Sequence, residues 1–200
     1  MDIDAGPLAK LRKSLNADLA DAPEGLKVSF NDMIIKATAI ALGRVPECNA
    51  SYTPTALVFH RRVDVSVAVA IDEGLVTPVV RNADTKSLLE ISREVRELAG
   101  RARDRKLSSE EMTNGTFSVS NLGMYGIEEF AAVINPPEGA ILAVGAIRSE
   151  PVVQGDSIVA GKRLKVTLSC DHRVVDGAVG SRWLAALRDI IERPTQILAL

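Results

Sequence analysis

The sequence predicts one α+β domain with a mixed or antiparallel sheet. Helical and strand-like segments are mixed along the chain without the regular alternation of parallel α/β folds. Most strand-like segments gather in the C-terminal half, and two turn signals typical of hairpins separate neighbouring strands. The chain has 200 residues, a length typical of a single domain. We therefore expect residues 1–200 to fold as one unit.

Four segments carry the periodicity or the capping signals of helices. Leucines recur at helical spacing in the first segment, and Ser29 is a good N-cap for the second. Ser87 and Glu90 have the spacing of a capping box, which opens the third. Residues 21–25 break the first helix. The predicted helices span residues 4–19, Ser29 to Pro46, Ser87 to about Arg103, and Asp176 to about Pro194.

The strand signals are alternation and short apolar runs. The clearest lies at residues 63–71, where valine or isoleucine occupies every second position, and this pattern predicts a strand with one apolar face. A turn is expected at residues 72–74, and a hairpin around Gly155-Asp156. The other predicted strands cover residues 75–80, 116–120, 140–146 and 164–169.

The composition argues against several classes of protein. The net charge is −2, with basic and acidic residues interspersed, which is unlike a nucleic-acid-binding surface. No apolar run approaches the ~18 residues of a membrane span, and the acidic N-terminus is unlike a secretory signal. Two cysteines without a Cys/His cluster predict neither a disulfide framework nor a metal site. We expect an intracellular protein in a reducing compartment, cytoplasmic if bacterial and in the mitochondrial matrix if eukaryotic.

Residues of possible chemical importance gather around His172. This histidine follows a predicted strand and precedes the last helix, with Asp171 and Arg173 on either side and Asp176-Gly177 shortly after. Loops on a rigid scaffold commonly carry active-site residues. The simpler interpretation is a loop histidine whose hydrogen bonds are satisfied by its neighbours, and the residues alone favour it.

Three sequence blocks carry a resemblance to a known family. Residues 171–177 match the H-x-x-x-D-G signature shared with chloramphenicol acetyltransferase. Residues 117–145 contain Ser-Asn-Leu-Gly and later Asn-Pro-Pro, and residues 67–81 contain Val-Ala-Val-Ala and Gly-Leu-Val-Thr-Pro. In this order the blocks resemble the catalytic domain of the dihydrolipoamide acyltransferases of 2-oxo acid dehydrogenase complexes. The resemblance implies a chloramphenicol acetyltransferase-like two-layer sandwich with a mixed or antiparallel sheet.

The resemblance also implies catalytic roles for His172, Asp176 and Ser120. A neutral imidazole, with an ordinary pKa near ~6.5, can accept the proton of a thiol whose pKa is about 8.5. His172 is therefore the expected general base, and Ser120 the expected hydroxyl donor to the tetrahedral oxyanion. Alternatively, Ser120 bonds its own backbone at a strand end. Asp176 is expected to order the His172 loop, to cap the last helix, or both.

Two further residues near His172 have weaker expectations. Gly177 is expected to permit a close backbone approach. Cys170 is expected to be a small buried hydrophobe and not a nucleophile, although it lies close to His172 in the sequence. Arg173 is expected to be structural, and the other histidine, His60, to lie at the surface or on an edge strand.

The same resemblance implies the substrates and the assembly. The block around Ser120 looks most like the acetyl-transferring members of pyruvate dehydrogenase complexes, which pass acetyl between coenzyme A and a lipoyl group on a separate domain. Family members form homotrimers in which His172 and Asp176 would face Ser120 of a neighbour. Trimers build cages of about 24 or about 60 subunits and bind other components of the complex. The tail at residues 197–200 resembles the anchor of such contacts, or else covers its own core.

Departures from the family pattern leave alternatives open. The chain begins where the family's catalytic domain is already under way, and it contains no recognisable lipoyl or peripheral-subunit-binding domain. We therefore expect an N-terminally shortened catalytic domain with a partly exposed sheet edge. One alternative is a non-catalytic scaffold of the same complex, and another is a branched-chain or succinyl-transferring homologue. A stand-alone chloramphenicol-type enzyme is disfavoured by Thr77-Pro78 and Asn135-Pro136-Pro137.

Overall fold

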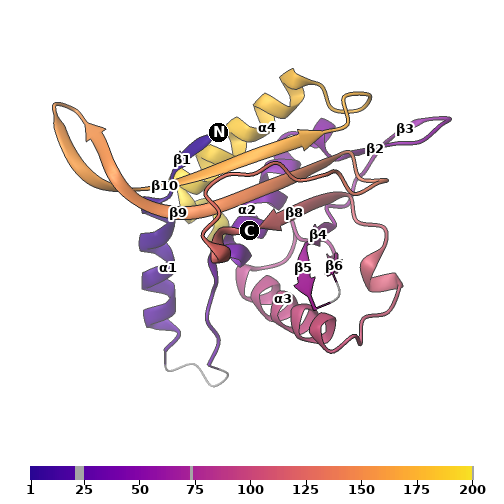
Figure 1. The fold of residues 1–200 in the computed structure, drawn as a ribbon, viewed down its shortest axis with the longest axis horizontal. Coiled ribbons are helices and arrows are strands. Elements are labelled where there is room, and N and C mark those ends of the chain that lie inside the picture. The colour runs from indigo at the N-terminus through magenta and orange to yellow at the C-terminus, as the bar shows by residue number, and fades with distance from the viewer. Residues whose placement is uncertain (21–24, 73, 200) are drawn as a thin grey trace.

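A mixed six-stranded sheet forms the centre of the computed structural model, which describes residues 1–20, 25–72 and 74–199 (Figure 1). The strand order is β1-β10-β9-β8-β4-β7, in which β4–β8 and β8–β9 are parallel and the other pairs antiparallel. The strands of this sheet are β1 (Asp2–Asp4), β4 (Val65–Val67), β7 (Val79–Val80), β8 (Phe117–Asn121), β9 (Ala140–Gln154) and β10 (Ser157–Cys170). The mixed sheet agrees with the predicted fold class.

Two short hairpins lie beside the main sheet, and four helices pack with it. The hairpins are β2 (Ala50–Tyr52) with β3 (Leu57–Phe59), and β5 (Val69–Ile71) with β6 (Gly74–Val76). The helices are α1 (Gly6–Asp18), α2 (Phe30–Arg44), α3 (Leu88–Arg103) and α4 (Gly177–Glu192). Short 3-10 turns are η1 (Pro46–Cys48), η2 (Glu110–Met112), η3 (Gly123–Tyr125) and η4 (Pro194–Leu198). All four predicted helices are therefore present.

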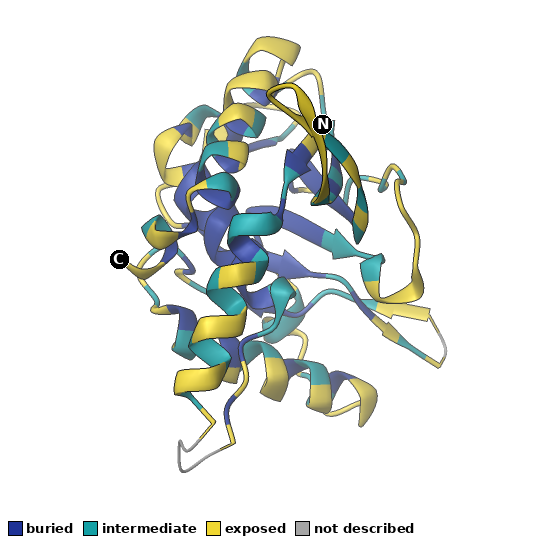
Figure 2. Cartoon of the chain, turned by 90° about the vertical axis from the view of Figure 1, so that its left-hand side faces the viewer, coloured by how far each residue is buried: buried dark blue, intermediate teal, exposed yellow. Residues whose placement is uncertain are grey.

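The hydrophobic core lies between one face of the sheet and the helices α2 and α4. Alternate residues of β8, Phe117 and Val119, are fully buried in this core, and the Phe117 ring lies 4.9 Å from that of Trp183 in α4. Buried residues concentrate in the sheet and in the helix surfaces that meet it, with exposed loops on the opposite side (Figure 2). The arrangement is a helix layer on a sheet layer.

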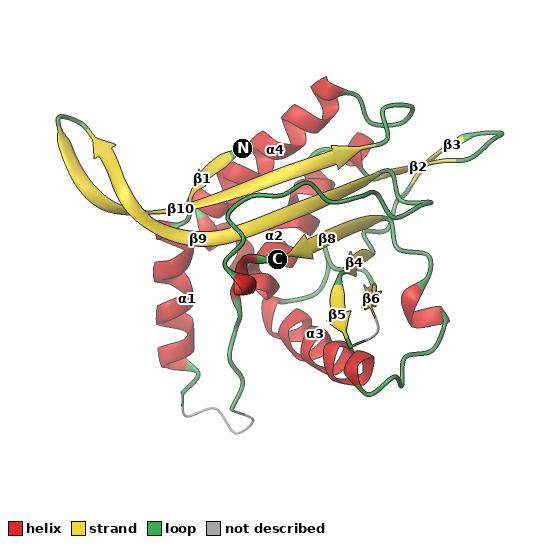
Figure 3. Ribbon diagram, in the orientation of Figure 1, coloured by secondary structure: helices red, strands yellow, loops and turns green. Residues whose placement is uncertain are grey.

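The opposite face of the sheet is crossed by a segment without regular structure, residues 126–138, which we call the crossing loop (Figure 3). The Ala146 amide donates to the Ile127 carbonyl at 2.8 Å, so the loop is bonded to β9. A Cβ atom on Gly145 would lie only 2.0 Å from the carbonyl oxygen of Glu128. Glycine at position 145 thus permits the loop to lie directly on the sheet backbone.

Three predicted segments differ from the structure. The first helix begins at Gly6 rather than at residue 4, because residues 2–4 pair with β10 and the Asp4 carboxylate accepts a hydrogen bond from the Gly6 amide at 2.8 Å. This strand also covers part of the sheet edge that we expected to be exposed. The segment 63–71 is divided between β4 and β5, and the segment 75–80 between β6 and β7; in each case the two strands belong to different sheets. The predicted break at 21–25 and turn at 72–74 include residues outside the described ranges.

The C-terminal hairpin is confirmed but is longer than predicted. Gly155 adopts a φ of +60° at its tip, and β9 and β10 pair along most of their lengths. The hairpin projects beyond the body of the molecule (Figure 1). The tail after α4 covers its own core at Ile197, whereas Leu198 is 48% exposed and Leu200 lies outside the described residues.

Candidate active site

His172 lies in a tight turn between β10 and α4. The Asp171 amide donates to the Gly139 carbonyl at 2.8 Å, and the Asp171 carbonyl accepts hydrogen bonds from the amides of Val174 and Val175, both at 2.9 Å. Val175 is fully buried, whereas the His172 side chain is exposed. The backbone of the turn is therefore anchored at both ends while the imidazole faces outward, available to a substrate or to another chain.

Ionic and aromatic contacts fix the residues that flank His172. The Arg173 guanidinium donates to both Asp171 carboxylate oxygens, at 2.9 and 2.6 Å, and its central carbon lies 3.8 Å from the ring centre of Tyr52 on β2. These hydrogen bonds lower the pKa of Asp171 to about 2. Arg173 thus has the structural role expected for it, and it links the His172 turn to the β2–β3 hairpin.

Asp176 is the N-cap of α4. Its carboxylate accepts a hydrogen bond from the Val179 amide at 2.8 Å, so the capping interpretation is confirmed. Among the described residues, no hydrogen bond joins Asp176 to His172. The expected close approach at Gly177 is wrong, because a Cβ atom there would meet nothing within 4 Å.

Ser120 lies on β8, on the sheet face opposite the hydrophobic core. Its neighbours on this strand, Val119 and Asn121, point the other way, and Asn121 fixes the strand end by accepting a hydrogen bond from the Gly123 amide at 2.9 Å. The Ser120 side chain is half-buried, and its hydroxyl makes no hydrogen bond within the described part of the chain. The hydroxyl is thus free to donate to another group.

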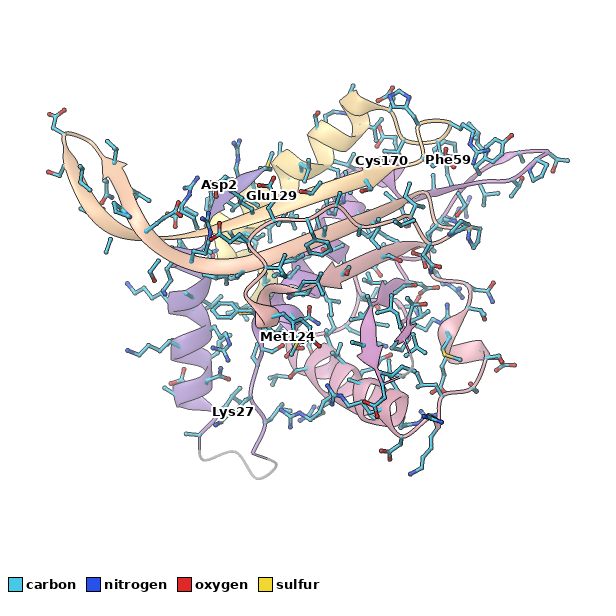
Figure 4. The ribbon with its side chains drawn as sticks, viewed as in Figure 1. Asp2, Lys27, Phe59, Met124, Glu129 and Cys170 are labelled. Carbon is cyan, nitrogen blue, oxygen red and sulfur yellow. The ribbon has the colours of Figure 1, made fainter. Side chains whose placement is uncertain are left out.

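Within one chain, Ser120 and His172 lie far apart. In the strand register, Ser120 of β8 is opposite Ala143 of β9, and Ala143 is opposite Thr167 of β10. His172 lies five residues further along the chain, beyond the end of β10. At about 3.3 Å per residue and about 4.8 Å between strands, the two side chains are roughly 15–20 Å apart. Figure 4 places Cys170, at the end of β10, far from Met124, just after β8. The structure brings His172 and Asp176 into one turn but leaves Ser120 separate.

Two cavities within the described part of the chain lie away from Ser120 and His172. One, of about 580 Å³, is bordered by α1 and the projecting β9–β10 hairpin. Another, of about 240 Å³, is bordered by residues of α1, α3 and η4. Neither is lined by Ser120 or His172.

The remaining candidate groups have ordinary structural surroundings. Burial raises the pKa of the Cys170 thiol to about 11, so this cysteine is not an activated nucleophile. His60 follows β3 and shares a 2.8 Å hydrogen bond with Ser51, as expected for an edge position. The described residues contain no group of three or more side chains suited to hold a metal ion.

No helix within the described ranges is both long and apolar enough to cross a membrane.

Comparison with known proteins agrees with the resemblance read from the sequence. The family model for 2-oxoacid dehydrogenases acyltransferase (catalytic domain) matches residues 1–199. The chain belongs to this family. The dihydrolipoyllysine-residue acetyltransferase component of the pyruvate dehydrogenase complex of Rickettsia felis is 47% identical over 191 residues, which are 96% of this chain and 46% of that protein. The mitochondrial component of Caenorhabditis elegans is 45% identical over 98% of this chain and 40% of its own length. The chain thus spans less than half the length of these relatives.

Solved structures of the family have the same fold. Dihydrolipoamide acetyltransferase from Azotobacter vinelandii, studied for the role of a serine, a histidine and an asparagine in its catalytic mechanism, has a TM-score of 0.93 and 34% identity. The cubic core of a pyruvate dehydrogenase multienzyme complex has a TM-score of 0.93 and 35% identity, and both comparisons cover 99% of this chain and 82% of the other. Chloramphenicol acetyltransferase, with a TM-score of 0.62 and 13% identity over 96% and 86% of the two chains, shares the fold, which confirms the predicted fold class.

Proposed function

We propose that this chain is the catalytic domain of a dihydrolipoyllysine-residue acyltransferase and that it transfers acetyl between a lipoyl thiol and coenzyme A. One observation carries the proposal. Ser120, His172 and Asp176 follow one another at the same intervals as the serine, histidine and asparagine studied in the Azotobacter enzyme. Asparagine and aspartate are equally good N-caps, so the difference at the third position preserves the capping role seen here.

His172 acts as the general base. Its imidazole accepts the thiol proton of coenzyme A, and the resulting thiolate attacks the thioester carbonyl of the acetyl-lipoyl group. The Ser120 hydroxyl donates a hydrogen bond to the oxyanion of the tetrahedral intermediate. The intermediate then expels the lipoyl thiolate, which takes the proton from the His172 imidazolium. Acetyl passes directly between the two thiols, without an acyl-enzyme and without a metal.

The active site forms between chains of a homotrimer. The distance between Ser120 and His172 within one chain supports this arrangement, because one proton acceptor and one oxyanion donor must meet the same carbonyl group. Exposed apolar side chains after β8 support it too, since Met124 is 79% and Val133 88% exposed in the single chain. We propose that coenzyme A and a lipoyl domain reach this shared site from opposite ends.

Assembly beyond the trimer is proposed from the likeness to a cubic core. A cage of about 24 subunits is favoured over one of about 60, and it would carry the other components of the dehydrogenase complex. Acetyl is favoured over succinyl or branched-chain groups because the relatives compared are named acetyltransferases. Relatives include bacterial and mitochondrial proteins, so we place the protein in the cytoplasm of a bacterium or in the mitochondrial matrix of a eukaryote.

An assay of acetyl transfer from acetyl-coenzyme A to free dihydrolipoamide tests the proposal. We expect His172→Ala to lower kcat about 10²- to 10⁴-fold and Ser120→Ala about 10²- to 10³-fold. Asp176→Asn is the matched variant, and it retains most of the activity because it preserves the helix cap. Wild-type turnover by His172→Ala contradicts the assignment of the base, and an inactive wild type favours the scaffold. Succinyl- and isobutyryl-coenzyme A in the same assay measure the acyl preference.

A further inference from the structure

A buried carboxyl group lies at the end of the crossing loop. Glu138 is only 3% exposed, and its two carboxyl oxygens accept hydrogen bonds from different strands, one from the Ser66 hydroxyl of β4 and the other from the Ser118 hydroxyl of β8. No lysine or arginine within the described residues forms an ion pair with it. The carboxyl group is thus joined to the sheet by neutral donors alone.

The surrounding backbone is shaped around this group. A Cβ atom on Gly115 would lie 2.0 Å from the Ser66 hydroxyl and 2.4 Å from the nearer Glu138 carboxyl oxygen. A Cβ atom on Gly139 would lie 2.3 Å from the carbonyl oxygen of Ala50. Glycine at both positions therefore lets β2, the crossing loop and the start of β8 pack closely around Glu138.

The buried group is close to the proposed oxyanion donor. Ser118 and Ser120 are alternate residues of β8, so their side chains lie on the same face of the strand, about 6.5–7 Å apart. Ser66 is directly level with Ser118 on the parallel neighbour β4. The hydrogen bonds of Glu138 thus fix the part of β8 that immediately precedes Ser120.

We propose that Glu138 is a positioning residue for the transfer reaction, which holds β8, and with it Ser120, in place through Ser66 and Ser118. This inference rests on the proposed function of Ser120. The carboxyl group touches no reacting atom and acts through the strand. An oxyanion donor stabilises charge most when its position is fixed before the reaction, which is what the two buried hydrogen bonds provide.

The surroundings of Glu138 also affect its ionisation. Burial raises the pKa of this carboxyl group, and the two serine hydroxyls oppose the shift only in part. The titratable groups on adjoining elements have partners of their own: His60 bonds Ser51 on β2, and Asp64, just before β4, pairs with Arg62 and Arg81. The serine hydroxyls of β4 and β8 are thus the groups that hold this carboxyl group in place.

Steady-state kinetics of transfer by wild type, Glu138→Ala and Glu138→Gln, together with the melting temperature of each protein, test the proposal. We expect Glu138→Ala to lower kcat at least about 10-fold with little change in KM, because misplaced groups lose catalysis more than binding. Glu138→Gln keeps a hydrogen-bonding side chain of the same size and restores kcat to within about 3-fold of wild type.

Ser118→Ala and Ser66→Ala form a matched pair that keeps the test decisive if Glu138→Ala does not fold. Each removes one hydrogen bond to the carboxyl group, but only Ser118 shares a strand with Ser120, so Ser118→Ala should lower kcat more. A folded Glu138→Ala with wild-type kcat overturns the proposal, as does a folded Glu138→Gln that fails to restore kcat. If the role of Glu138 is overturned but Ser120→Ala is inactive, the proposed function stands. An active Ser120→Ala would instead remove the basis of both the proposed function and the role of Glu138.

Discussion

The two regions that carry the proposed catalytic groups are held in different ways. His172 lies in an exposed turn whose flanking side chains form a surface ion pair and a contact with the Tyr52 ring. Ser120 lies on a strand of the sheet, next to a buried carboxyl group that two hydroxyls bind from neighbouring strands. Figure 2 shows the general pattern of exposed turns around a buried sheet.

The difference matches what each group must do. The backbone of the His172 turn is anchored by hydrogen bonds, but the imidazole itself is exposed and has no such buried partner, so this side chain is the less restrained of the two. Buried hydrogen bonds are costly to break, so the position of Ser120 is strongly restrained. An oxyanion donor depends on a fixed position, whereas a base on an exposed turn can adjust to the incoming thiol. The single chain thus carries one rigid and one adaptable half of the proposed site.

The largest expected difference between the two regions is in how much an added methyl group destabilises the protein. Gly115→Ala places a methyl group into the buried Glu138 cluster and should destabilise the protein by about 1–3 kcal/mol. Gly177→Ala is the matched control beside the His172 turn, where the methyl group meets open space, and it should be neutral or slightly stabilising. Urea unfolding measures both. Equal effects would mean that the two regions are equally restrained.

A smaller effect is expected from the ion pair beside His172. Arg173→Lys keeps the positive charge but loses the bidentate hydrogen bonds to the Asp171 carboxylate and the stacking on the Tyr52 ring. We expect kcat to fall about 3- to 10-fold while the melting temperature changes little. Hydrogen bonds from Arg173 lower the pKa of Asp171 to about 2. The ion pair therefore contributes to the stability of the folded protein above pH 3.8, the ordinary pKa, and this contribution is lost only as the pH falls toward 2.

The control for this variant is Arg182→Lys, which alters an exposed ion pair between Arg182 of α4 and Glu47 of η1. Its kcat should equal that of wild type. If both arginine variants lose activity equally, the effect belongs to the general charge of the surface and not to the His172 turn.

Local signals in the sequence were sufficient for the helices and for part of the site. The caps at Ser29 and Ser87, the hairpin at Gly155 and the cap at Asp176 each depend on residues close together in the chain. The strands β1, β2 and β3 escaped prediction because they are short and depend on distant partners: β1 pairs with β10 from the other end of the chain.

The Glu138 cluster and the Tyr52–Arg173 contact could not be predicted for the same reason. Glu138 looked like an ordinary loop residue after two prolines, and its partner Ser66 is 72 positions away in the sequence. Arg173 was correctly expected to be structural, yet nothing near it in the sequence identified Tyr52 as its partner. The separation of Ser120 from His172 follows from strand register, which alternation alone does not specify.

Complementation between inactive variants tests the central claim, that one active site takes His172 from one chain and Ser120 from another. His172→Ala and Ser120→Ala would be refolded together in equal amounts and assayed for acetyl transfer. Random trimers should regain about a quarter of the wild-type activity, because about a quarter of the shared sites then contain both intact residues. A mixture of His172→Ala with the double variant is the control and should stay inactive. No recovery in well-mixed trimers would contradict the account.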